Sequence, residues 1–196
     1  MTYFSRLKSR ARAWHRDESG SVAVETVLMV PLLAWAMLAT LTYFDAYRNE
    51  AISYKAGLVL ADAVSREADT LTDDYIDGLY GLHQFLMLKD KNPDMRITAF
   101  RYRANNNDYR RVWSESRGSK PALNHAALNA LSDRLPTMAN GERAILVETW
   151  SDYEAPYAVG LGDFDMATYN VISPRFTLRI CFDNSPGDGN DGSVRC

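Results

Sequence analysis

The chain has 196 residues and a formal net charge of −3, which leaves room for one domain of modest size together with a membrane anchor. The charge is unevenly spread, because residues 1–20 carry a net charge of +3 and the remainder therefore carries −6. A basic stretch can bind nucleic acid, but its position directly before an apolar run favours a role in membrane topology. We therefore expect no nucleic-acid partner.

The apolar run extends from Val22 to Phe44, and Glu25 is its only residue that carries a charge at neutral pH. About 20 apolar residues suffice for a helix to cross a bilayer, so this run is long enough. The positive-inside rule keeps residues 1–20 in the cytoplasm and exports the acidic remainder. We therefore predict a leader over 1–20, a membrane-spanning helix over 21–44 in contact with lipid, and an exported domain.

Two residues of the predicted span are unusual there. A carboxylate inside a membrane segment costs a few kcal/mol, which makes Glu25 a functional candidate, although a Glu near a helix end can also simply reach the headgroups. Pro31 removes one backbone hydrogen bond and tends to kink a helix, a break that membrane segments tolerate. The kink either has no function or helps subunits to pack, and the sequence leaves both open.

The same helix is predicted to continue to residue 68, with 45–68 as its amphipathic half. Apolar or small residues recur at helical spacing along one face, and we expect that face to dock onto the exported domain, residues 69–196. The residues are Tyr47, Ala51, Tyr54, Leu58 and Ala61.

The exported domain begins with a second helix, capped by Thr72 and ending near Lys89. A hairpin follows, with strands over 95–103 and 109–115 and an Asn-rich turn between them. Further on we predict a short helix over 121–135, a strand over 144–153, an irregular segment over 154–170 and a strand over 176–182. The fold class is therefore α+β, with an antiparallel sheet of about four strands and helices on one face.

Two cysteines, Cys181 and Cys196, lie in the exported part. An oxidising compartment and an even count favour a disulfide between them, which would contribute about 3 kcal/mol by chain-entropy arguments. The loop between them is rich in Gly, Asp and Asn, and its carboxylates suit Ca²⁺, although it lacks the EF-hand spacing. We expect a solvated loop without metal, and the candidate ligands are Asp183, Asp188 and Asp191.

We find no pattern typical of an enzyme and expect no cofactor. The exported histidines, His83 and His125, have no partner motif, and zinc spacing, a nucleophile elbow and a phosphate-binding loop are all missing from the sequence. We therefore expect both histidines to be structural or to face solvent.

The stretch Gly20-Ser21-Val-Ala-Val-Glu25 resembles the processing site of type IV prepilins. Together with the hairpin over 97–115 and the segment over 144–153, it is similar to the TadE/TadG-like pseudopilins of tight-adherence (Flp-type IVb) pili. One departure is Thr26, where such proteins usually have an aromatic residue. The resemblance covers most of the chain and implies a pilin-like fold.

The resemblance implies cleavage by a prepilin peptidase between Gly20 and Ser21, on the cytoplasmic side of a bacterial inner membrane. Glu25 would then be the fifth mature residue and would assist assembly, by pairing with the new amine of Ser21 in its own chain or in a neighbour. The expected partners are that peptidase, other pseudopilins or the pilin, and the inner-membrane assembly platform. The expected function is pilus assembly, hence adhesion and biofilm.

Two alternatives compete with this interpretation. The first is a periplasmic binding domain on an uncleaved signal anchor. The second is a secreted protein that signal peptidase cuts after Ala36, at the site Ala34-Trp35-Ala36.

Overall fold

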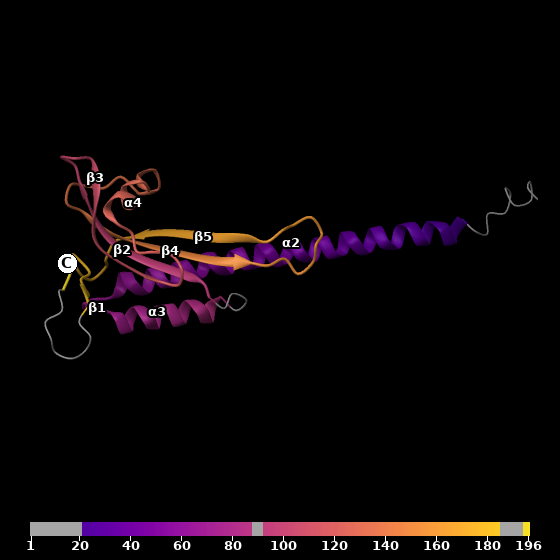
Figure 1. Ribbon diagram of the computed structural model, residues 1–196, viewed down its shortest axis with the longest axis horizontal. Coiled ribbons are helices and arrows are strands. Elements are labelled where there is room, and N and C mark those ends of the chain that lie inside the picture. Colours follow the sequence, from indigo (N-terminus) through magenta and orange to yellow (C-terminus); the bar gives the residue numbers. More distant parts are fainter. Residues whose placement is uncertain (1–20, 88–91, 185–193) are drawn as a thin grey trace, which may run out of the picture. The chain divides into compact units, whose positions relative to one another are not determined.

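The computed structural model describes residues 21–87, 92–184 and 194–196 (Figure 1). The described chain is α+β, as predicted, with one long apolar helix and a small antiparallel sheet with helices. The elements, in order, are α2 (Ser21–Arg66), β1 (Leu71–Thr72), α3 (Asp73–Leu86), β2 (Asp94–Arg103), β3 (Asp108–Arg117), α4 (His125–Asn129), a 3₁₀ turn (Ser132–Arg134), β4 (Arg143–Tyr153), β5 (Phe164–Ile172) and β6 (Phe182–Asp183).

The contacts divide the chain into two compact units. The helix unit consists of α2 up to Asp45 together with the β4–β5 loop, Ala155–Leu161. The sheet unit consists of Ala46–Glu154 and Gly162–Cys196, and so includes the second part of α2. The helix α2 thus belongs to both units, and each unit is described by itself below.

The main sheet has the strand order β3-β2-β4-β5, and all its pairs are antiparallel. The predicted hairpin is present as β2 and β3, and Asn107 in its turn adopts a positive φ of 50°, which Asn tolerates better than most residues. The predicted strand over 144–153 is present as β4, and Thr72 caps α3 as predicted by accepting a hydrogen bond from the backbone N–H of Tyr75.

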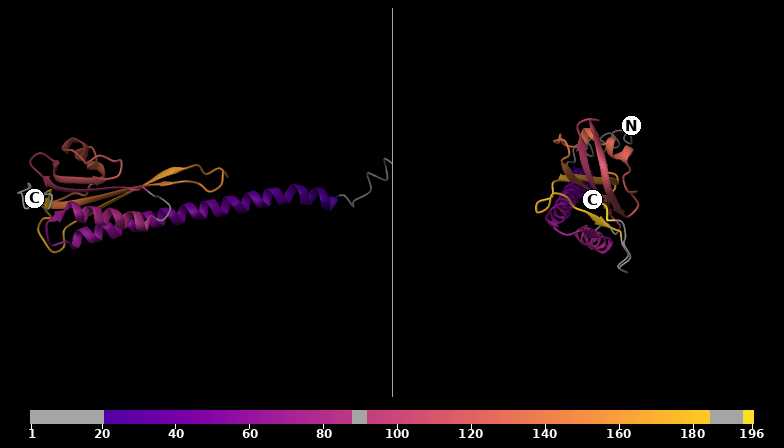
Figure 2. Two further views of the ribbon diagram at one scale, coloured as in Figure 1. Left: turned by 60° about the horizontal axis from the view of Figure 1, so that its bottom comes forward. Right: turned by 90° about the vertical axis from the view of Figure 1, so that its left-hand side faces the viewer.

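Both faces of the sheet are covered, so the prediction of helices on one face is wrong. The second part of α2 and helix α3 pack on one face, around Leu60, Ile76, Ile97 and Trp113. On the opposite face α4 and the segment after it pack around Phe100 and neighbouring residues (Figure 2). The predicted helix over 121–135 is present only as α4 and a 3₁₀ turn. Side chains alternate between the faces of a strand, so β2 and β4 contribute to both cores.

Two predictions between residues 154 and 182 are wrong. Strand β5 occupies much of the segment predicted to be irregular, and most of the predicted strand over 176–182 is loop, with only Phe182 in a strand. In that loop Leu178 is 95% exposed, whereas Ile180 and Phe182 are buried. The short strand β6 pairs in parallel with β1 rather than with the main sheet.

The face of α2 that packs on the sheet differs from the predicted face. Tyr47 is 70% exposed and Tyr54 is 57% exposed, and Ala51 and Leu58 are exposed as well, so the predicted stripe lies on the surface except for the buried Ala61. The buried face of this second part consists mostly of small or polar residues and contains Ala46, Asn49, Ser53, Ala56, Gly57, Leu60, Ala61, Val64 and Ser65.

Gly57 allows α2 to approach β4 and β5 closely. A Cβ atom at this position would lie 2.5 Å from Thr168 Oγ1 and 2.8 Å from Asn170 Nδ2. The side-chain hydroxyls of Thr149 and Thr168 share a hydrogen bond of 2.6 Å beside it, and Ser151 donates one of 3.3 Å to Ser53. This part of the interface between helix and sheet is therefore close and polar.

Candidate functional site

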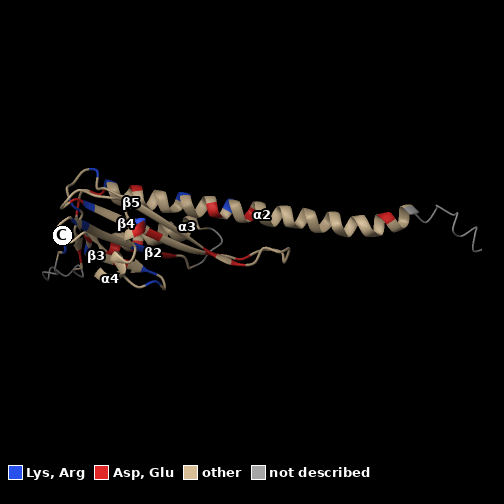
Figure 3. Ribbon diagram, turned by 90° about the horizontal axis from the view of Figure 1, so that it is seen from above, with Lys and Arg blue, Asp and Glu red and all other residues tan. Residues whose placement is uncertain are grey.

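The first part of α2 is the most unusual surface of the described chain. Its most apolar window of 18 residues has a mean hydropathy of 2.0, and none of that window is buried. Figure 3 shows this stretch without charges except for one acidic position near its start. By length and composition α2 can span a membrane, which agrees with the predicted anchor, although an N-terminal signal sequence has the same properties.

Glu25 is exposed on this apolar helix. The adjacent Thr26 donates a hydrogen bond of 2.7 Å from its hydroxyl to the backbone oxygen of Val22, so this polar side chain is satisfied within the helix. Ser21 is the first residue of α2, whereas Gly20 lies outside the described residues. Cleavage between Gly20 and Ser21 and the role of Glu25 in assembly therefore stay predictions.

The helix continues through Pro31 and through Ala36. Pro31 has no N–H to donate to the preceding turn, but the ladder resumes beyond it. Thr40 and Thr42 bond back to the backbone oxygens of residues 36 and 38, at 2.9 Å each. A cut after Ala36 would therefore divide a helix that is continuous in the structure.

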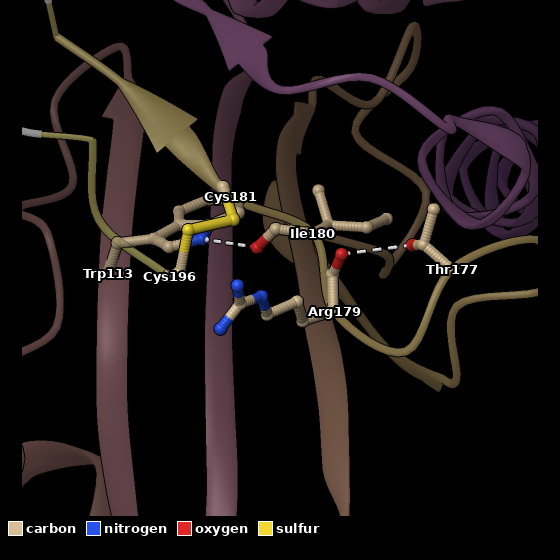
Figure 4. The surroundings of a disulfide bond; sticks show 6 residues. All are labelled: Trp113, Thr177, Arg179, Ile180, Cys181 and Cys196. Atoms are coloured by element: carbon tan, nitrogen blue, oxygen red, sulfur yellow. Dashed lines mark hydrogen bonds between the residues drawn. A yellow bond between two sulfur atoms is a disulfide. The ribbon is translucent and has the colours of Figure 1, made fainter.

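The predicted disulfide between Cys181 and Cys196 is present, with a Cα–Cα distance of 4.3 Å. Figure 4 shows the bond beside Trp113, whose indole N–H donates a hydrogen bond of 2.9 Å to the backbone oxygen of Ile180. The backbone of Phe182 exchanges two hydrogen bonds with that of Arg195, at 2.9 and 2.8 Å. The disulfide thus holds residues 194–196 against β6 and adds about 3 kcal/mol on chain-entropy grounds.

Of the candidate metal ligands, only Asp183 belongs to the described residues, and it lies in β6. Asp188 and Asp191 lie outside them, so calcium binding by this loop is untested. Within 21–87, 92–184 and 194–196 no group of three His, Cys, Asp or Glu residues could hold a metal ion.

His83 and His125 lie on elements that cover opposite faces of the sheet. His83 is fully buried in α3, and His125 at the start of α4 has an exposed side chain 3.5 Å from Asp108. Arg103 also binds Asp108, and this hydrogen bond lowers the pKa of the Asp108 carboxyl below its usual value. The histidines are not brought together, and the prediction that the protein is not an enzyme stays a prediction.

The structure contains a buried ion pair that the sequence analysis missed. Arg96 and Glu148 face each other on β2 and β4 and form two hydrogen bonds, of 2.6 and 2.9 Å. Arg96 also donates to the backbone oxygen of Pro121, at 2.8 Å, and lies over the ring of Trp150. These contacts fix the segment before α4 on the sheet. Only the strand register, which the sequence does not show, could have revealed the pair.

Comparisons with protein-family models, with curated proteins and with solved structures found no match to this chain.

Proposed function

We propose that the protein is a minor pilin-like subunit of a tight-adherence (Flp-type IVb) pilus system. A prepilin peptidase cuts it after Gly20, the apolar part of α2 holds it in the bacterial inner membrane, and it acts in pilus assembly and hence in adhesion and biofilm. The observation that carries the proposal is the exposed Glu25, five residues after Gly20 on a largely apolar helix surface that has no other charge as far as Phe44.

The chemistry of this surface supports assembly. Exposed apolar side chains on all sides of a helix need either lipid or neighbouring apolar helices around them. A lone carboxylate on that surface needs a cationic partner when it leaves water. After cleavage, the new α-amine of Ser21 lies one helical turn from Glu25, or the same amine in a neighbouring subunit supplies the charge.

The proposed topology places residues 1–20 in the cytoplasm and the sheet unit in the periplasm. The disulfide between Cys181 and Cys196 supports this side, because the periplasm is oxidising and the cytoplasm is not. The partners in this proposal are the prepilin peptidase, other pseudopilins or the pilin, the inner-membrane assembly platform and membrane lipid. The subunit needs no cofactor and catalyses no reaction.

The decisive experiment determines the N-terminal residue of the membrane-extracted protein, with and without the prepilin peptidase. A start at Ser21 that depends on the peptidase supports the proposal. A start at Met1 in both strains points to an uncleaved signal anchor. A start at Met37 identifies a secreted protein and removes any role for Glu25.

Two variants separate processing from assembly. Gly20→Arg blocks cleavage, whereas Glu25→Ala leaves cleavage intact and impairs assembly of pili, measured as surface pili and surface adhesion. Thr26→Ala is the matched control, because Thr26 is the adjacent exposed position and its hydroxyl bonds only within the helix among the contacts seen. Normal pili in the Glu25→Ala strain would exclude the role proposed for this carboxylate.

A further inference from the structure

The β4–β5 loop, Ala155–Leu161, forms a unit with the first part of α2 rather than with the strands on either side of it. Figures 1 and 2 both show this loop beside the helix. The loop is therefore grouped with the part of the helix that is apolar enough to span a membrane. Whether the loop itself suits a membrane depends on the charge and polarity of its side chains.

The loop is uncharged over all of its residues, with the sequence Ala-Pro-Tyr-Ala-Val-Gly-Leu. Pro156, Tyr157 and Ala158 are exposed, whereas Val159 is only 6% exposed. Acidic residues flank it in the sequence on both sides, at Asp152 and Glu154 before it and at Asp163 and Asp165 after it. Apolar and aromatic residues thus occupy the loop, and the charges begin directly outside it.

The helix residues that lose exposure indicate the level at which the loop lies, because the loop and this part of α2 belong to one unit. Between Val22 and Phe44 only Ala36, Ala39 and Thr42 lose exposure, and they share one helix face. A hydrocarbon core about 30 Å thick accommodates about 20 helical residues, so a span that starts at Val22 leaves this core near Leu41. Thr42 is the only buried residue of the three and lies at this boundary, so we place the loop where the helix passes from hydrocarbon into the headgroup region.

We propose that the loop Ala155–Leu161 is a second membrane contact, which inserts into the interfacial layer of the bilayer beside α2. This inference rests on the membrane span in the proposed function. Tyr is enriched in this layer, because its ring prefers an apolar surrounding while its hydroxyl stays wet. The flanking carboxylates remain in water and so limit the depth of insertion.

The backbone of the loop explains why the contact is interfacial and not deeper. Irregular backbone exposed to hydrocarbon would leave polar groups unsatisfied, and such loops are not found there. Within the loop, the N–H of Val159 bonds to the oxygen of Tyr157 at 2.9 Å, and Gly160 allows a positive φ of 100°. The remaining backbone groups can meet water and lipid carbonyls in the headgroup region.

Photo-crosslinking of the full-length chain in phosphatidylcholine nanodiscs tests the proposal. A benzoylphenylalanine replaces Tyr157 in the loop, Leu33 on the exposed surface of α2, or Tyr169 in β5, which is also exposed. Lipid adducts are then counted by intact mass. We expect adducts at 157 with a yield close to that at 33, and none above background at 169.

The three positions distinguish the two levels of the proposal. Adducts at 33 without adducts at 157 overturn the loop contact and leave the membrane span intact. A lack of adducts at 33 overturns the span and the loop contact together. The attachment point on the lipid reports depth, because adducts at 157 confined to the ends of the acyl chains would contradict an interfacial position.

A charge in the loop gives an independent test. Ala158→Asp places a carboxylate at an exposed loop position, and Ala167→Asp places the same charge at an exposed position of β5. We expect the first change to reduce the adduct yield at 157 and the second to leave that yield unchanged. Equal yields in both variants would show that the loop lies outside the bilayer.

Discussion

The two parts of α2 differ in how much of their surface is buried. Up to Phe44 the helix exposes large apolar residues, with Leu33 63% exposed, and its shielded positions are few and small. From Ala46 onward it covers the sheet with mainly small and polar residues and keeps Tyr47 and Tyr54 on the surface. What packs against each part of the helix, and not hydrophobicity alone, therefore decides which face is buried.

The largest expected effect concerns the sheet that the second part of α2 covers. Glu148→Gln leaves the buried Arg96 without its charged partner, which should lower the free energy of unfolding by about 3–5 kcal/mol. We expect denaturant titration of the chain in nanodiscs to show this loss, while the first part of α2 stays protected from protease by the lipid. Arg66→Gln is the control, since its ion pair with Asp62 is exposed and such pairs contribute about 0–1 kcal/mol.

A charge introduced into the first part of α2 tests whether this part, unlike the second, inserts into a membrane. Leu33→Arg should weaken membrane insertion by about 3 kcal/mol, since an Arg at the centre of a span is strongly unfavourable. Leu58→Arg, at an exposed position of the second part, should leave insertion unchanged. Insertion efficiency into membrane vesicles measures both. Equal losses would mean that the two parts do not differ in their surroundings.

Removal of the disulfide should have the next largest effect on stability. Replacement of Cys181 and Cys196 by Ser should lower the free energy of unfolding of the sheet unit by about 3 kcal/mol, because the loop in the unfolded chain is no longer closed. Thermal unfolding of the wild-type chain with and without reductant should show the same loss. If reductant destabilised the double variant as well, the loss would have another cause.

The close contact at Gly57 tests the second part of α2 directly. Gly57→Ala adds a Cβ within 3 Å of Thr168 and Asn170, and overpacking of this kind costs about 1–3 kcal/mol. Gly78→Ala in α3 is the matched control, because nothing lies within 4 Å of the added atom and Ala favours a helix by about 1 kcal/mol. We expect opposite shifts of Tm. A stabilised Gly57→Ala variant would contradict the close packing.

The smallest expected effect depends on pH and concerns Glu115 in β3. Burial raises the pKa of the Glu115 carboxyl above its ordinary value, although Arg195 lies 3.6 Å away. An acid with a raised pKa in the folded state disfavours folding when it is charged, and this cost disappears as the pH falls through that pKa. Glu115→Gln should therefore raise Tm slightly at pH 7, and the gain should shrink at acidic pH. A gain independent of pH would exclude this cause.

The sequence predicts those elements that have a local signal, such as a long apolar run, a capping residue or a turn between two strands. Helix α2, the Thr72 cap, the β2–β3 hairpin and β4 all appear close to their predicted bounds. Strand β5 was missed because its buried residues include the polar Thr168 and Asn170, which give no apolar alternation. Phe176 and Leu178 alternate well but are exposed, because alternation does not show whether a partner strand is present.

The candidate site was predictable only in part. The disulfide could be predicted because it depends on an even count of cysteines, whereas the role of Glu25 stays a prediction from a local pattern. The buried face of α2 differs from the predicted face because Tyr47 and Tyr54 are apolar enough to suggest burial, whereas the helix meets a polar part of the sheet at Ser53 and Gly57. The association of the loop Ala155–Leu161 with the first part of α2 could not be predicted, because it depends on contacts between residues that are far apart in the sequence.

The parallel pairing of β1 with β6 has a consequence for the order of folding. Leu71 meets Phe182, roughly 110 residues later, whereas β2–β3 and β4–β5 join neighbours in the sequence. Local pairs close short loops and form early, and distant pairs must wait for the chain between them. The pairing of β1, which follows α2, with β6 should therefore form after the two hairpins. Pulse-labelling hydrogen exchange during refolding should show protection at the N–H of Leu71, which bonds to Cys181, later than at β2 and β4.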